Sequence, residues 1–124
     1  MIRGARGATT VSANTEEAII TATKELMAKL IEVNNIAPDS VASAFVSTTE
    51  DIDAAFPAKA LRQFKGWTYV PVMCMREMPV PNSLKMCVRI MLHVNTNLAQ
   101  EEIVHVYLRE AKVLRPDLGS SIES

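Results

Sequence analysis

Alternating and helix-periodic hydrophobic residues divide the chain into short strands and two helices. The clearest strand covers residues 85–96, where one side of the strand is apolar throughout and consists of Met86, Val88, Ile90, Leu92 and Val94. Short segments rich in apolar or β-branched residues predict further strands at residues 2–11, 41–49, 67–75 and 106–114. Because Pro71 lies inside residues 67–75, we expect that strand at a sheet edge or with a bulge.

A helix is predicted to begin at Asn14, an N-cap residue type with Glu17 three positions later, and to end at Asn34 and Asn35. Its apolar stripe has helical spacing and consists of Ile19, Ile20, Thr23, Leu26, Met27, Leu30 and Ile31. A shorter helix is predicted from residue 57 to about 64, with Gly66 as its stop, and a helical turn at residues 100–103. This order predicts an α/β (α+β) fold, a mixed five-stranded sheet packed by helices.

Composition excludes several classes of protein. The 124 residues fit one domain, which we expect at residues 1–115, followed by a polar, flexible tail at 116–124. Thirteen basic and 14 acidic residues, with 5% aromatic residues, argue against nucleic-acid binding. There is no apolar run of roughly 18 residues and no signal-peptide block, so we expect neither a membrane span nor export. Two free cysteines then favour the cytoplasm.

The chain offers few residues for metal or covalent chemistry. Cys74, Cys87, His93 and His105 do not match a metal-ligand spacing, so no metal is expected. Neither histidine belongs to a nucleophilic triad, and Cys74 has no adjacent base that would activate its thiol. No glycine-rich phosphate loop is present, so a nucleotide cofactor is not expected either.

Arg89 is the first candidate for chemistry, because the second face of its strand mixes Cys87, Arg89, Met91, His93 and Asn95. This residue is either an ordinary exposed arginine or one placed in a cleft or subunit contact. Other cations are expected near strand ends or on the short helix: Arg3, Arg6, Lys59, Arg62, Arg76 and Arg115. Such a set suits a small dicarboxylate, since guanidinium pairs carboxylate in bidentate fashion. Spacing alone also permits plain solvation of these charges.

Six blocks in order resemble the monofunctional chorismate mutases of the AroH class. They are residues 2–11 (IRGARGATTV), 55–60 (AFPAKA), 69–78 (YVPVMCMREM), 87–91 (CVRIM), 105–108 (HVYL) and 113–118 (VLRPDL). The resemblance implies a homotrimer arranged as a pseudo-α/β barrel, with active sites between neighbouring subunits. It also implies the cofactor-free [3,3] rearrangement of chorismate, a dianion, to prephenate in the biosynthesis of phenylalanine and tyrosine.

The resemblance also implies a role for each site residue. Arg89 would face the ether oxygen that gains negative charge, Arg6 and Tyr107 would hold carboxylate, and Glu77 would bind the ring hydroxyl. Cys74 would line the same pocket, with the backbone of residues 73–77, including Met73, Met75 and Arg76, as one wall. The adjoining subunit would supply Phe56, Lys59 and Arg62, and Leu114 and Arg115 would close the site, with the tail ordering over ligand.

Two positions test this assignment. Cys74 and Glu77 are an odd number of residues apart, so a regular strand points them to opposite faces. If both face the ligand, the strand must bulge or end near Met75 and Arg76; a regular ladder through Glu77, with its side chain away from Arg89, would contradict the assignment. Asn82 stands where the family often has glycine, and asparagine tolerates the left-handed conformation.

Two other kinds of protein remain as alternatives. A small trimeric imine deaminase on a related fold would use its arginine to hold a carboxylate while water attacks, but the six blocks argue against it. A non-catalytic anion-binding protein is disfavoured because Arg6, Glu77, Arg89 and Tyr107 are all present.

Overall fold

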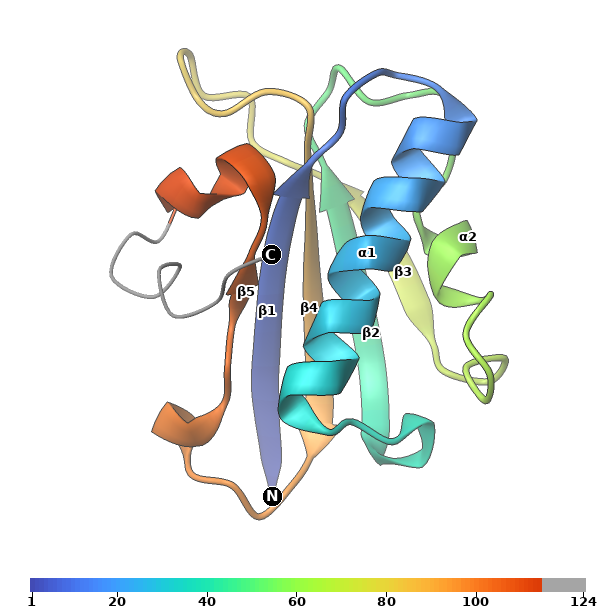
Figure 1. Ribbon diagram of the computed structural model, residues 1–124, viewed down its shortest axis with the longest axis vertical. Helices are drawn as coiled ribbons and strands as arrows, with labels where there is room; N and C mark the ends of the chain where they lie inside the picture. Colours follow the sequence, from blue (N-terminus) through green and yellow to red (C-terminus); the bar gives the residue numbers. More distant parts are fainter. Residues whose placement is uncertain (115–124) are drawn as a thin grey trace.

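Five strands form one mixed sheet in the computed structural model, which describes residues 1–114. They are β1 (Ile2–Thr10), β2 (Val41–Thr48), β3 (Val72–Arg76), β4 (Cys87–Asn95) and β5 (Val106–Tyr107). The spatial order is β3-β2-β4-β1-β5 (Figure 1). Strand β4 is antiparallel to β1 and β2, whereas β3 runs parallel to β2 and β5 parallel to β1. The predicted mixed five-stranded sheet is confirmed.

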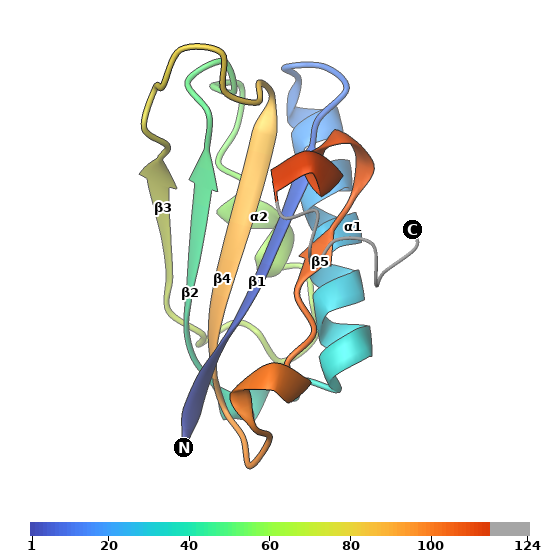
Figure 2. The ribbon, with the colours of Figure 1, turned by 90° about the vertical axis from the view of Figure 1, so that its left-hand side faces the viewer.

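Both α-helices, α1 (Glu16–Asn34) and α2 (Ala58–Leu61), pack on the same face of the sheet (Figures 1 and 2). The predicted stripe of α1 is largely buried there, with Ile19, Leu26, Met27 and Leu30 at 0% exposure. Burial of such side chains contributes about 1.5–3 kcal/mol each, so this helix–sheet layer holds most of the core. Within residues 1–114 no helix is both long and apolar enough to cross a membrane.

The start of α1 corrects the sequence-based prediction by one residue. Thr15, not Asn14, is the N-cap, and its Oγ1 accepts a hydrogen bond from the amide of Ala18 at 3.2 Å. Asn14 instead donates to Asp53 and accepts from the amides of Asp53 and Ala54. Its side chain therefore ties the start of the helix to the loop that leads into α2. The predicted end is confirmed, since Asn35 caps the helix with φ 50°.

Two predicted strands are shorter than expected. The third begins at Val72, directly after Pro71, because proline has no amide hydrogen for the ladder; its predicted edge position is confirmed. The fifth covers Val106–Tyr107 alone, and a 3-10 helix, η3 (Arg109–Leu114), replaces the rest of it. Arg109 has φ 53°, which turns the chain out of the strand. Two further 3-10 turns are η1 (Pro38–Ser40) and η2 (Gln100–Glu102).

The two faces of the sheet differ in chemistry. On the helix face, β4 contributes Val88, Ile90, Leu92 and Val94 to the core, as the alternation predicted. Met86 was expected to extend this set, but it lies before β4 with φ 53° and is only half-buried. On the opposite face, which we call the open face, neither α-helix covers the sheet, and the polar residues of β4 lie there.

Candidate active site

Arg89 lies at the centre of a row of residues that crosses the open face. The strand registers pair Ser47 with Met75 and Arg89, Arg89 with Ala8, and Ala8 with Tyr107. Residues paired in this way point to the same side of a sheet. Ala8 lies between Arg89 and Tyr107 in this row. Because its side chain is small, a depression separates the guanidinium from the phenol.

Glu77 lies beside Arg89 but does not form a direct hydrogen bond with its Nε. Its Oε2 is 3.6 Å from the Nε of Arg89, which is longer than an N–H···O hydrogen bond. The Nε atom is buried and has no hydrogen-bond acceptor among residues 1–114. The arginine side chain as a whole is 40% exposed and that of Glu77 25% exposed. The pair thus combines charge attraction with one donor, the Nε–H of Arg89, that has no acceptor among residues 1–114.

Arg6 is held by Tyr107 of β5 and by His105, the residue directly before that strand. Its Nε donates to the hydroxyl of Tyr107 at 3.1 Å, and its main-chain amide donates to Nδ1 of His105 at 3.1 Å. Tyr107 is 2% exposed, so the phenol is a fixed partner for the guanidinium. His105 was not among the sequence-based candidates. The sequence does place it two residues before Tyr107 and so on the same side of a strand, a position that indicated a contact near the site.

A second group of predicted residues lies away from Arg89. A groove of about 1110 Å³ runs between α2 and β3, and its lining includes Phe56, Lys59, Arg62 and Cys74. Met73 and Met75 also border it from the edge strand, although alternation places their side chains on the open face. Phe56 is 77% exposed there, and Lys59 Nζ is 3.4 Å from Glu16 Oε2. The groove therefore carries an exposed aromatic ring and two cations, from the residues that the family resemblance assigned to the adjoining subunit.

Strand β3 separates these two groups. It ends at Arg76, but its pairing with β2 is regular up to that residue and the amide of Glu77 still donates to Thr48, so the irregularity predicted near Met75 and Arg76 does not bring Cys74 and Glu77 to one face. Glu77 points to Arg89, so the contradicting arrangement is absent, whereas Cys74 packs against the core on the helix face. The expectation that Cys74 lines the Arg89 pocket is therefore corrected for a single chain: alternation along the strand puts it with the groove.

Arg76 is committed to the fold rather than to either group. Its Nη1 donates to Oγ1 of Thr48 at 3.1 Å and to the carbonyl oxygens of Thr49 and Ile52 at 2.8 Å each. These bonds fasten the end of β3 to the turn after β2. We therefore assign the side chain of Arg76 to holding the strand end beneath Glu77, and only its backbone can line a site.

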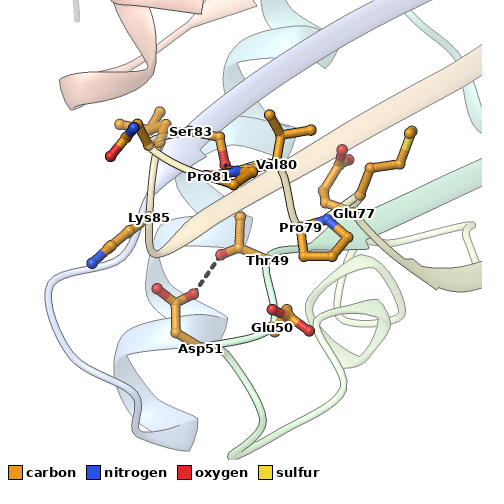
Figure 3. A pocket seen from close by; sticks show the side chains of 12 residues that line it. Thr49, Glu50, Asp51, Glu77, Pro79, Val80, Pro81, Ser83 and Lys85 are labelled. Carbon is orange, nitrogen blue, oxygen red and sulfur yellow. Dashed lines mark hydrogen bonds between the residues drawn. The ribbon is translucent and has the colours of Figure 1, made fainter.

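The connection from Glu77 to β4 forms the wall of a hollow of about 490 Å³, which Glu77, Thr49 and Asp51 also line (Figure 3). Both carboxylate oxygens of Asp51 accept from the amide of Met86, at 3.1 and 3.0 Å. Asn82 has φ 67°, so the expected left-handed conformation at this turn is confirmed. These contacts determine where the chain leaves Glu77 and enters the strand of Arg89.

The C-terminal part of the described chain covers one end of the open face. Leu114 packs, with Leu84, against a buried cluster that consists of Ala8, Cys87, Tyr107 and Ala111. This contact places Leu114 near the Arg6–Tyr107 pair, where the sequence expected it to close the site. Arg115 and the predicted tail at residues 116–124 lie outside the described residues.

Burial raises the pKa of the Cys87 thiol, and the neighbouring Arg89 guanidinium offsets only part of that effect. The unfolded chain therefore loses this proton first, so the free energy of unfolding should fall as pH rises above the ordinary thiol pKa of about 8.5. Urea unfolding at pH 7.5 and 9.5 should show this fall, and Cys87→Ala should reduce it.

We also expect a thiol reagent at about pH 8 to label Cys87 only after unfolding; rapid labelling of native Cys87 would contradict its burial.

The fold and these contacts define an α+β domain whose open face carries Arg6 and Arg89 beside Tyr107 and Glu77. The family model for chorismate mutase type I matches residues 2–118. A chorismate mutase AroH of Bacillus subtilis is 53% identical over 119 residues, which cover 96% of this chain and 94% of that protein. A chorismate mutase AroH of Thermus thermophilus is 48% identical, with 98% and 99% covered. The chain therefore belongs to the type I chorismate mutase family.

A solved structure agrees with this assignment. The chorismate mutase from Clostridium thermocellum superposes with a TM-score of 0.86 at 47% identity, and the match covers 89% of this chain and 97% of that one. A TM-score of 0.86 over this share of both chains shows that the two proteins have the same fold.

Proposed function

We propose that this protein is a chorismate mutase that converts chorismate to prephenate at a site centred on Arg89. The reaction is an isomerisation within one molecule: the ether C–O bond breaks while a C–C bond forms, and no group or electron leaves the substrate. The observation that carries the assignment is the buried Nε of Arg89, which has no acceptor among residues 1–114, beside an acid and an arginine–tyrosine pair. The product feeds the biosynthesis of aromatic amino acids.

Each residue on the open face has a role that its contacts support. The guanidinium of Arg89 faces the ether oxygen, where negative charge grows in the transition state; one such preorganised donor typically contributes ~3–4 kcal/mol. Arg6, oriented by Tyr107, binds a substrate carboxylate. Glu77 accepts a hydrogen bond from the ring hydroxyl. By holding the substrate in its compact reactive conformer, these contacts also lower the entropic part of the barrier.

We further propose that the site is completed by a neighbouring copy in a homotrimer. Phe56, Lys59 and Arg62 line a groove between α2 and the edge strand β3, whereas Arg89 lies on the open face of β4, with β2 between the two strands, so one chain does not direct both sets at one substrate. The edge strand β3 also exposes Met73 and Met75, at 59% and 46%, which a second copy can cover. In this arrangement the groove of one subunit, with its Cys74, faces the Arg89 row of the next.

The catalytic domain in this proposal includes all of residues 1–114, whereas its expected last residue, Arg115, and the expected tail at 116–124 lie outside the described part of the chain. We place the enzyme in the cytoplasm, where its two free thiols are compatible with a reducing environment.

The direct test is the loss of chorismate absorbance on addition of purified protein. We expect steady conversion to prephenate without added cofactor, at a rate that EDTA does not change, because the rearrangement needs no metal or redox partner. Product identity follows from acid conversion of prephenate to phenylpyruvate. Release of ammonia from a 2-imino acid, with no loss of chorismate, would instead support the imine deaminase alternative.

A further inference from the structure

Ser47 lies between the acid and the arginine of the proposed site. It belongs to β2 and pairs with Arg89 in β4 on one side and with Met75 in β3 on the other. Its hydroxyl donates a hydrogen bond to Oε2 of Glu77. That same oxygen is the one 3.6 Å from Nε of Arg89.

Strand β2 holds Glu77 through two successive residues. The main-chain amide of Glu77 donates to the carbonyl oxygen of Thr48 at 2.9 Å, although β3 itself ends at Arg76. Thr48 therefore determines where the backbone of Glu77 lies, and Ser47 determines where its carboxylate points. Without the hydroxyl, the direction of the carboxylate would depend on its attraction to Arg89 alone.

Guanidinium and carboxylate groups close into direct hydrogen-bonded pairs when nothing restrains them. Here the gap stays at 3.6 Å, and Nε of Arg89 has no acceptor within residues 1–114. We propose that Ser47 is a positioning residue that keeps the Glu77 carboxylate from closing on Arg89. The restraint leaves Arg89 available to the ether oxygen and Glu77 to the ring hydroxyl, and this inference rests on the proposed function of the site.

The expected effect is mainly on kcat. When Ser47 is replaced by alanine, the carboxylate moves onto Arg89, and that pair must open before the guanidinium reaches an oxygen whose charge develops only in the transition state. We expect kcat to fall about ten- to a hundredfold, the range for one hydrogen bond to a charged group. KM should change less, because Arg6 and Tyr107 still bind the carboxylate.

Three companion variants make the test specific. Ser47→Thr keeps the hydroxyl and should recover most of the lost kcat. Ser43→Ala makes the same chemical change on the same strand and face, where the hydroxyl contacts His93 instead, and should match the wild type. Ser47→Ala should cost less than about twofold in a Glu77→Gln background, because a neutral amide does not close on the guanidinium. An equal loss in both backgrounds would show that Ser47 acts through packing, and would overturn the proposal.

A spectroscopic measurement does not depend on residual activity. The Arg89 Nε–H resonance, assigned by its loss in Arg89→Lys, should move downfield and exchange more slowly with water in Ser47→Ala, because it then hydrogen-bonds Glu77. An unchanged resonance would overturn the proposal even if kcat fell. Failure of the proposed function gives a different result. A wild-type protein that does not consume chorismate would refute the proposed function. An active wild type with a fully active Ser47→Ala would refute only the role of Ser47.

Discussion

Replacing Arg89 with alanine is expected to lower kcat for the rearrangement of chorismate by about a hundred- to a thousandfold, the effect of removing one preorganised donor at developing charge. The side chain is 40% exposed, its Nε makes no hydrogen bond within residues 1–114, and Glu77 keeps the hydroxyl of Ser47 as a donor when the guanidinium is removed. The fold should therefore survive. Circular dichroism, size-exclusion chromatography and steady-state kinetics measure these outcomes together.

Two controls separate charge from geometry in this experiment. Arg89→Lys keeps a positive charge but lacks the planar fork of the guanidinium, so we expect an intermediate loss. Arg3→Ala removes an arginine from the far end of β1, where Nε donates to the carbonyl oxygen of Leu98, and should leave kcat near the wild-type value. Full activity of Arg89→Ala would refute the assigned mechanism.

Mixed trimers should regain activity that neither parent variant has. One parent is Arg89→Ala, which damages the open face; the other is Lys59→Ala with Arg62→Ala, which damages the groove. In a ring of three, a trimer that contains both kinds of subunit has one site in which an intact open face meets an intact groove. Co-expressed variants purified through two different tags should therefore show about a third of the wild-type kcat.

The same experiment decides between sites within and between subunits. If one chain formed the whole site, every subunit in the mixture would be defective and no activity would return. Trimers purified through two tags that both carry Arg89→Ala are the matched control, and should remain inactive. A monomer in solution would contradict the proposal before any mixing.

The sequence predicted whether a segment is a helix or a strand more accurately than it predicted the first and last residue of that segment. Alternation in residues 85–96 placed Arg89 opposite the core face, and β4 confirms that placement. The local signals failed at ends: Asn14 and Thr15 are both good N-cap residues, and only the contact of Asn14 with Asp53 shows why Thr15 takes that position. The strand expected at residues 106–114 ends at Tyr107, since Ala111 and Leu114, three residues apart, pack from a 3-10 helix instead.

The candidate site was predicted as a set of residue types and not as an arrangement. The resemblance named Arg6, Glu77, Arg89 and Tyr107, and their contacts confirm that these four lie together on the open face. No sequence signal indicated Ser47, because a serine on a strand is common and its partner lies 30 residues away.

The sequence by itself determined which strand positions are apolar, which carry charge, and where helices begin and end to within three residues, the largest error being the end of α2 at Leu61. These properties follow from local periodicity and capping, which act over a few residues. The tertiary structure alone decided the register that sets Ser47, Arg89, Ala8 and Tyr107 in one row, and the 3.6 Å gap between Arg89 and Glu77. Register depends on pairing between segments far apart in the chain, and a one-residue slip would turn every side chain of a strand to the other face.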